Sequence, residues 1–233
     1  MARRVAEDAG SVSGFQFERD GAEYFPLLAA DAIADLDHLF CEDGAVAGRR
    51  LTEITAIEPH IGIDSPTARK VSELLGAAAR PVRAIAFDKT QGANWALGWH
   101  QDRTICVKRR VDAPGFGPWT TKQGIAHVQP PFSVTKAMVT VRIHLDDVDR
   151  GNAPLKIALG SHLLGRVRDA DAAVVAENHE TVECFARSGD VWVYATPILH
   201  ASDRASAGIR RRVLQVDYSA AVLPEPLEWL LEV

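Results

Sequence analysis

The residues with the clearest capacity for chemistry lie in the tetrapeptide Trp99-His100-Gln101-Asp102. Side chains at positions i and i+2 of an extended segment point the same way, so His100 and Asp102 can present a nitrogen and an oxygen to one metal ion. A third ligand would complete the two-histidine, one-carboxylate triad that binds iron(II) and leaves coordination positions open. A chain with eight histidines contains an isolated His-x-Asp triplet easily by chance. The metal hypothesis therefore needs a second signal.

That signal comes near the C-terminus, where His200 follows an apolar run and Arg211 lies eleven residues later. A 2-oxoglutarate ion that chelates a metal needs a fixed cation for its distal carboxylate, and a planar guanidinium suits that role. Arg211 stands between Arg210 and Arg212, and alternation along a strand prevents all three from facing inward. Arg211 is the preferred candidate, with either neighbour as the alternative.

The elements that must position these residues divide the chain into two parts. Residues 1–80 are expected to be mainly helical, because residues 27–40 and 66–79 place apolar side chains on one face. Residues 81–220 are expected to form strands, since short apolar runs alternate there with Gly, Pro and Asn. The runs are residues 82–87, 137–145, 155–159, 182–186, 191–194 and 212–218. The length predicts a single domain over residues 1–233.

One of these runs has an unusually polar face, formed by Thr140, Arg142 and His144. Polar side chains inside a β-barrel are costly unless they line a wet cavity. Arg142 and His144 are therefore candidates for substrate binding, and the alternative is that this face of the strand meets solvent.

Residues 111–132 are rich in Gly and Pro and are expected to form a long irregular loop that serves as an active-site lid. Trp119, Gln123 and His127 are candidates for substrate contacts from this lid. The alternative for Gln123 and His127 is hydrogen bonding within the loop itself.

Composition limits the possible partners. The net charge of -5 and the pI near 5.9 argue against a nucleic-acid or anionic-membrane binder. No apolar stretch approaches the roughly 20 residues of a membrane span. The three cysteines show neither disulfide nor zinc-site spacing, which favours a cytoplasmic location: Cys41, Cys106 and Cys184. The expected partner is a small-molecule substrate. Nothing in the sequence indicates the oligomeric state.

The chain resembles the phytanoyl-CoA dioxygenase-like branch of the Fe(II)/2-oxoglutarate oxygenases over about residues 14 to 220. The motifs that carry the resemblance are Trp99-His100-Gln101-Asp102, Asn152-Ala153-Pro154-Leu155, Gly160-Ser161-His162, His200-Ala201-Ser202 and Arg211. The resemblance implies a mainly β fold, a double-stranded β-helix or cupin-like jelly roll, with N-terminal α-helices.

The resemblance also implies roles for individual residues. His100, Asp102 and His200 would bind iron, Arg211 would pair with the distal carboxylate of 2-oxoglutarate, and Gln101 and Ser202 would touch this co-substrate. The implied activity is hydroxylation of a small molecule by O2, with release of succinate and CO2. Halogenation is disfavoured, because halogenating relatives carry a small residue where this chain has Asp102.

Three alternatives stay open at this point. The same cofactors could serve desaturation, epimerisation or cyclisation. The chain could also be a catalytically silent jelly-roll protein that binds a metal or 2-oxoglutarate. A cupin-like zinc or manganese protein is the third, although such a protein would not need Arg211.

Overall fold

The computed structural model describes residues 14–40, 48–206 and 210–231. Cys41 and the first 13 residues, and with them the expectations placed there, lie outside the described part of the chain.

The largest sheet has six antiparallel strands in the order β1-β11-β8-β13-β3-β2. Their bounds are β1 Ala22–Phe25, β11 Val191–Ala195, β8 Met138–His144, β13 Arg211–Ser219, β3 Arg80–Lys89 and β2 Gly48–Leu51. A second sheet has the order β10-β9-β12-β4, with β10 Thr181–Cys184, β9 Leu155–Ala158, β12 His200–Ser202 and β4 Leu97–His100. The third sheet has the order β5-β7-β6, with β5 Ile105–Val107, β7 Ile125–Val128 and β6 Trp119–Lys122.

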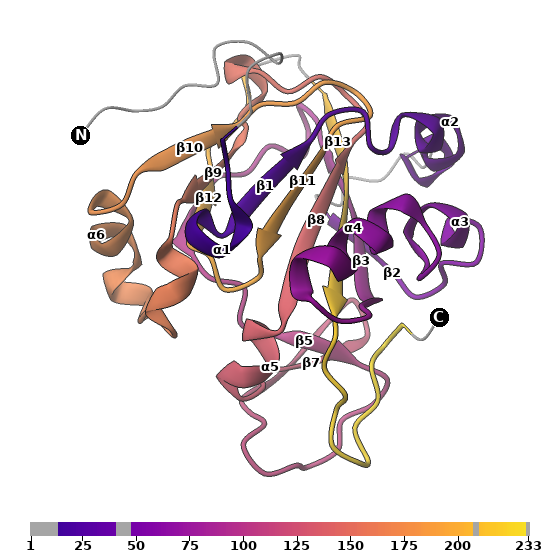
Figure 1. Ribbon diagram of the computed structural model, residues 1–233, viewed down its shortest axis with the longest axis vertical. Coiled ribbons are helices and arrows are strands. Elements are labelled where there is room, and N and C mark those ends of the chain that lie inside the picture. Colours follow the sequence, from indigo (N-terminus) through magenta and orange to yellow (C-terminus); the bar gives the residue numbers. More distant parts are fainter. Residues whose placement is uncertain (1–13, 41–47, 207–209, 232–233) are drawn as a thin grey trace.

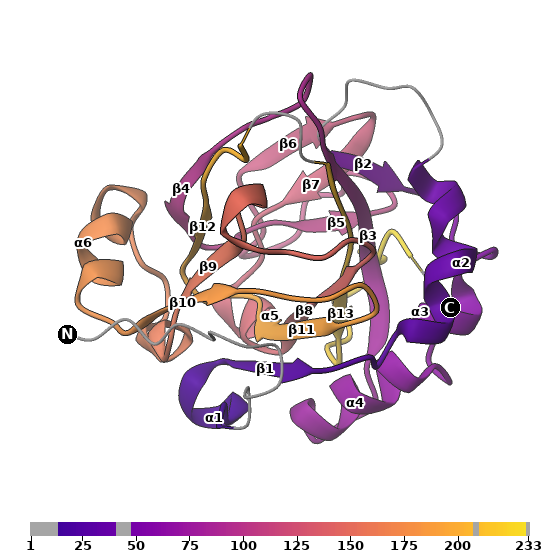
Figure 2. The ribbon, with the colours of Figure 1, turned by 90° about the horizontal axis from the view of Figure 1, so that it is seen from above.

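The three sheets enclose one interior. In Figure 2 the four-stranded sheet faces the six-stranded sheet across this interior, and the β5-β7-β6 sheet lies behind it. This is the predicted double-stranded β-helix, and the fold-class prediction is confirmed. In a jelly roll, alternate side chains of each strand point into this enclosed space, which makes it the natural place for a binding site.

Six α-helices accompany the sheets in the described part of the chain: α1 Phe17–Asp20, α2 Ile33–Leu36, α3 Glu58–Ile61, α4 Pro66–Leu75, α5 Phe132–Lys136 and α6 Ala172–Glu177. Short 3-10 turns lie at Ala30–Ala32, Asp37–Phe40, Arg150–Asn152, Ser161–Leu164 and Asp169–Asp171. Helices α2, α3 and α4 pack on the outer face of the large sheet (Figure 1). The longest, α4, is capped by Ser65, whose hydroxyl accepts a hydrogen bond from the Ala68 amide at 3.1 Å.

The main core lies between these helices and the outward side chains of the large sheet. Val139, Val141 and Ile143 of β8 are fully buried there, together with Leu36 and Val71 from the helices. The other side chains of β8 are buried too, but they point into the interior of the jelly roll, where Arg142 lies opposite Gln215 of β13. The polar face of this strand therefore lines the inside, as the alternation predicted.

The predicted strand runs are confirmed as β3, β8, β9, β10, β11 and β13. The N-terminal part holds helices, as expected, but also β1 and β2, which form the two edges of the large sheet. Each has only four residues, so an alternating pattern is too short to stand out from a helical one.

The expectation of an irregular loop over residues 111–132 is wrong in part. Strands β6 and β7 form a hairpin whose turn is Gln123-Gly124, and both turn residues have positive φ, 53° and 77°. Two-residue hairpin turns require this left-handed conformation, which Gly adopts easily and Gln rarely. The sequence signal was therefore weaker than an Asn-Gly turn would have given.

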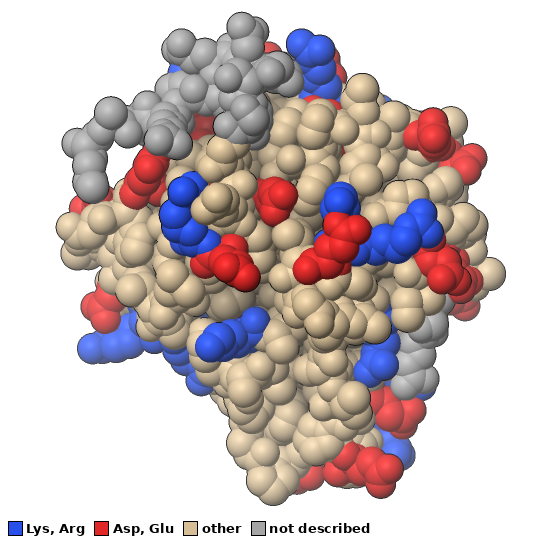
Figure 3. Space-filling model, in the orientation of Figure 1, with Lys and Arg blue, Asp and Glu red and all other residues tan. Residues whose placement is uncertain are grey.

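No helix in the described ranges has the length and apolar character needed to cross a membrane. On the face seen in Figure 3, acidic and basic side chains are interspersed and form no continuous basic patch.

Candidate active site

Strands β4 and β12 of the four-stranded sheet bring His100 and His200 together. In the antiparallel pairing of β4 with β12, these residues are direct partners, and their ring centroids lie 4.2 Å apart. Asp102 lies two residues beyond the end of β4 and turns its carboxylate to the same point. One ligand atom from each of the three residues lies within 4.8 Å of the other two. The structure thus assembles a two-histidine, one-carboxylate donor set from residues far apart in sequence.

The hydrogen bonds of the two imidazoles fix which nitrogen is free. Nδ1 of His100 lies 2.7 Å from the Gly98 carbonyl oxygen, and Nδ1 of His200 lies 3.0 Å from that of Ile198. A carbonyl can only accept, so Nδ1 carries a proton in both rings and Nε2 is the nitrogen left to bind a metal. Burial and the neighbouring His100 lower the pKa of His200 to about 4. His200 is therefore neutral at physiological pH, as a metal ligand must be.

Arg83 fixes the carboxylate of the set. It reaches Asp102 at 3.2 Å and Asp217 at 2.5 Å, and its own side chain is 7% exposed. Burial acts to raise the pKa of Asp102, but attraction to Arg83 opposes this and the pKa is lowered. Asp102 therefore stays ionised, with one oriented oxygen directed at the histidines.

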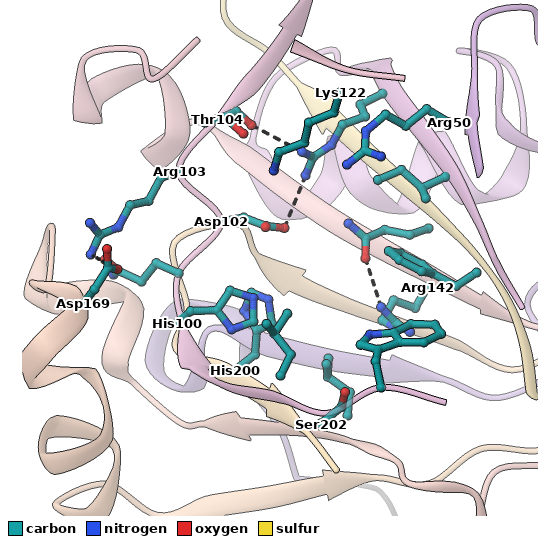
Figure 4. Close-up of a pocket in the computed structure, with 18 of the residues that line it drawn as sticks. Arg50, His100, Asp102, Arg103, Thr104, Lys122, Arg142, Asp169, His200 and Ser202 are labelled. Carbon is teal, nitrogen blue, oxygen red and sulfur yellow. Dashed lines mark hydrogen bonds and ion pairs between the residues drawn. The ribbon is translucent and has the colours of Figure 1, made fainter. Parts of the chain in front are cut away.

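The donor set opens onto a cavity of about 500 Å³, the usual size for a small-molecule site. Of the eleven residues singled out from the sequence, seven line it: His100, Gln101, Asp102, Arg142, His200, Ser202 and Arg211. The other four do not: Trp119, Gln123, His127 and His144. Figure 4 shows the arrangement, with His100, His200 and Asp102 along one wall.

The three consecutive arginines separate as strand alternation requires. Arg211 is 4% exposed and lines the cavity, where it donates to the carbonyl of Ala153. Arg210 pairs with Asp88, and Arg212 pairs with Asp146, outside the cavity. No carboxylate in the described part of the chain pairs with Arg211, and burial together with Arg142 lowers its pKa to about 9. Arg211 is thus a buried cation that lacks an anion.

Arg142 is the second buried guanidinium of this wall. It donates to the Gln215 side chain at 2.9 Å and lies over the Phe87 ring, 5.5 Å from its centroid. Its Nε has no hydrogen-bond partner among the described residues. Arg142 therefore keeps donor capacity for a molecule in the cavity.

Gln101 lines the cavity, but its amide group is fully engaged elsewhere. Its nitrogen donates to the carbonyls of Gly165 and Pro197 at 2.9 and 2.7 Å, and its oxygen accepts from the Val167 amide at 2.9 Å. Contrary to the expectation of a co-substrate contact, this side chain anchors the segment at residues 165–167 beside the metal-binding strand.

The four candidates outside the cavity have other surroundings. His144 is buried without a hydrogen-bond partner among the described residues, and burial together with two arginines keeps its pKa well below the usual range. Trp119 packs in a small apolar cluster. Gln123 donates to the Gly48 carbonyl at 2.8 Å and accepts from the Arg50 amide at 3.0 Å. None of these three side chains lines the cavity.

His127 is also outside the cavity, yet it touches a residue that lines it. It is fully buried on β7, and its Nε2 accepts a hydrogen bond from Nε of Arg50 at 3.1 Å. Burial lowers the pKa of His127 to about 4, so the ring is neutral and can accept.

Sequence reasoning missed several residues of the cavity, among them Arg50, Arg83, Phe87, Trp95 and Lys122. Arg83 and Phe87 share the inward face of β3, and alternation in the run 82–87 carried that signal. Arg50 and Lys122 lie on β2 and β6, which were not expected as strands, so no pattern marked them.

Comparison with known proteins gives a consistent result. A sequence model of the phytanoyl-CoA dioxygenase family matches residues 28–213. No curated protein matches the chain. Many solved structures share the fold, all of those compared at low sequence identity.

Three of these structures illustrate the likeness. AviO1 from Streptomyces viridochromogenes Tue57 is 22% identical with a TM-score of 0.62, covering 90% of this chain and 95% of its own. The non-heme alpha-ketoglutarate-dependent epimerase SnoN from nogalamycin biosynthesis is 17% identical with a TM-score of 0.63, covering 88% and 78%. HygX from Streptomyces hygroscopicus, with nickel and 2-oxoglutarate bound, is 16% identical with a TM-score of 0.60, covering 90% and 86%. Iron and 2-oxoglutarate, the cofactors expected from the sequence, thus agree with what these relatives bind.

Proposed function

Because the chain belongs to the phytanoyl-CoA dioxygenase family, we propose that it uses iron(II), 2-oxoglutarate and O2 to hydroxylate a small molecule, releasing succinate and CO2. The observation that carries the proposal is the convergence of His100, Asp102 and His200 on one point of a cavity that also holds the unpaired Arg211. A metal site alone would not need such a cation, whereas a site for a metal-chelating dicarboxylate would.

The donor set fits iron(II). Two imidazoles and one carboxylate form the facial triad of non-haem iron oxygenases, and the remaining positions stay open. Iron bound there would supply the activation of O2 coupled to the oxidation of 2-oxoglutarate. The protein contributes orientation: the carbonyls of Gly98 and Ile198 fix the rings, and Arg83 fixes the carboxylate.

The co-substrate is held at its far end. In this proposal Arg211 donates to the C5 carboxylate of 2-oxoglutarate, and Ser202, which also lines the cavity, donates its hydroxyl. Arg211 is fixed by the carbonyl of Ala153 before any ligand arrives, so little side-chain entropy is lost on binding. Gln101 is not assigned to the co-substrate, because its amide is already engaged.

Residues 111–132 were expected to form a lid over the active site. We propose that the β6-β7 hairpin alone covers the site. Lys122 of β6 lines the cavity, and Gln123 ties the hairpin turn to β2. A wall at this place would exclude water during the reaction. We also propose that the protein is a cytoplasmic enzyme that acts on a small molecule.

A second outcome with the same cofactors is epimerisation or ring closure. The observation that favours it is that two similar structures are the epimerase SnoN and the carbocyclase SnoK. Which outcome applies depends on the bond of the substrate that faces the metal. Asp102 argues against halogenation, because the carboxylate occupies the position that chloride would need.

The test is anaerobic addition of iron(II) and then 2-oxoglutarate, followed by the weak visible absorption of the chelated complex. The purified protein should develop this absorption. Asp102→Ala should lose or alter it, and Arg211→Met should need at least about tenfold more 2-oxoglutarate. Arg210→Met is the matched control, since Arg210 points out of the cavity. If the parent protein develops no absorption but binds zinc or manganese tightly, the proposal is wrong.

A further inference from the structure

Two basic side chains of the cavity are not used by the proposed chemistry. Arg50 on β2 and Lys122 on β6 both line it, and Figure 4 shows them together on one side, while Ser202 and Arg142 lie on the other. The metal-binding side chains occupy the wall between these two sides. A 2-oxoglutarate ion held by Arg211 and Ser202 would therefore leave Arg50 and Lys122 free for a second ligand.

The other charges near Arg50 and Lys122 are already matched. Arg83 is bound to Asp102 and Asp217, and Arg103 is bound to Asp169 at 2.9 Å. Neither Arg50 nor Lys122 forms an ion pair with any residue in the described ranges. This side of the cavity therefore has three cations, Arg50, Arg83 and Lys122, against the two carboxylates that Arg83 binds, in a protein whose formal net charge is -5.

Arg50 is built into the wall and is not a freely solvated side chain. Its Nε donates to His127, and its backbone amide donates to Gln123 of the hairpin turn. Burial lowers the pKa of Arg50, and repulsion from Arg83 lowers it further. A half-buried cation beside another cation is unfavourable unless an anion joins them.

His127 orients the guanidinium group of Arg50. Its neutral Nε2 takes the Nε hydrogen of Arg50, so the two terminal nitrogens of the guanidinium stay free for a ligand. We call His127 a positioning residue, because it acts through Arg50 and does not line the cavity.

The cavity also has apolar lining, to which Ile85, Phe87, Trp95 and Leu97 contribute, and Leu97 is 49% exposed. The Phe87 ring lies beside Arg142, and Ile85 lies between Arg83 and Phe87 on the same face of β3. A ligand that reaches Arg50 and Lys122 and also contacts this lining combines an anionic group with an apolar body.

We propose that the substrate of this enzyme is an organic acid whose oxyanion, a carboxylate, phosphate or sulfate group, is bound by Arg50 and Lys122 while its apolar body lies toward the metal. The proposal rests on the proposed function, because it assigns to the substrate the part of the cavity that 2-oxoglutarate leaves open. Two cations on separate strands bind one oxyanion from two directions and so set the orientation of the molecule.

The experiment is calorimetric titration of inorganic sulfate into protein loaded with zinc(II) and saturating 2-oxoglutarate, so that Arg211 is already occupied. Arg50→Gln and Lys122→Gln should each weaken sulfate binding by about tenfold. Arg50→Lys keeps the charge and should lose less. Lys136→Gln is the matched control, because Lys136 is exposed on α5 and does not line the cavity. Acetate, titrated in parallel, distinguishes a carboxylate site, where the two anions bind alike, from a phosphate or sulfate site, where sulfate binds more tightly.

The inference is overturned if the parent protein shows no saturable anion binding, or if all variants bind sulfate with the parental affinity. The visible absorption of the parent iron and 2-oxoglutarate complex is recorded on the same preparation. If this absorption is present and the sulfate result is negative, only the substrate inference fails; if the absorption is absent, the proposed function fails.

Discussion

Arg83 and Arg211 lie on neighbouring strands of the same sheet, both point into the jelly roll, and they are 6% and 4% exposed. Their environments are nevertheless opposite. Arg83 is held by two carboxylates, which raise its pKa despite burial. Among the described residues Arg211 has only the carbonyl of Ala153 as a partner, and its pKa falls to about 9. A buried cation with matched charges belongs to the architecture of a site, whereas one without an anion is prepared for a ligand.

The largest effect expected from this comparison is on stability. Arg83→Met should lower the free energy of unfolding by about 3–5 kcal/mol, because it leaves the carboxylate of Asp217 buried without its partner. Urea denaturation of the metal-free protein measures this. Arg210→Met, which breaks the more exposed pair with Asp88, should cost no more than about 1 kcal/mol. Equal losses of unfolding free energy in the two variants would show that Arg83 stabilises the fold no more than Arg210 does.

Arg211→Met should behave in the opposite way. Because this cation has no carboxylate to abandon in the described part of the chain, the free energy of unfolding without ligand should stay within about 1 kcal/mol of the parent or increase. The Kd for 2-oxoglutarate should rise by about tenfold to hundredfold, since hydrogen bonds to charged groups contribute about 1.5–3 kcal/mol. A large loss of stability with an unchanged Kd would reverse the roles given to Arg83 and Arg211.

The sequence predicted those parts of the site that depend on local geometry. His100 and Asp102 are two residues apart on an extended segment, and Arg211 follows from alternation along one strand. The same rule put Arg142 on the polar face of β8 but left open whether that face meets solvent or the interior, where the structure places it. Partners across strands were not predictable in this way, because the pairing of Arg83 with Asp217 depends on the register of β3 against β13.

The fold showed the same limit. The six longer apolar runs gave the main strands of the jelly roll, whereas β1, β2 and the β6-β7 hairpin are short and lack a strong turn signal. Arg50 and Lys122 lie on exactly these weakly marked elements. The unexpected hairpin also turns Trp119 and His127 away from the cavity, which the assumption of a loop could not reveal.

His127 extends the comparison to Arg50, another cation of the cavity without an ion-pair partner in the described ranges. Between pH 6.5 and about 4, the unfolded chain binds a proton at His127 that the folded protein does not, because burial lowers the folded pKa to about 4. The free energy of unfolding should therefore fall as the pH falls through this window, and the contribution should be constant above it.

His127→Gln should make this fall shallower by about 1–3 kcal/mol. Urea denaturation between about pH 7.5 and 4.5 measures it, with the exposed His38→Gln as control. A parental slope in His127→Gln would mean that the ring titrates in the folded protein as it does in the unfolded chain, so that burial does not keep it neutral below pH 6.5.

The smallest expected effect is on the position of Lys122 relative to Arg50. Gln123 connects the hairpin that carries Lys122 to the strand that carries Arg50, through hydrogen bonds of 2.8 and 3.0 Å. Gln123→Ala removes both bonds at an exposed position, so it should cost about 1 kcal/mol and weaken sulfate binding by about two- to fivefold. Calorimetry on the zinc(II) and 2-oxoglutarate complex measures the affinity, with the exposed Gln91→Ala as control. Because Arg50 is aimed by His127 as well, the loss should stay below that of Arg50→Gln. A loss as large as that would mean that the hairpin turn, and not His127, holds the cation in place.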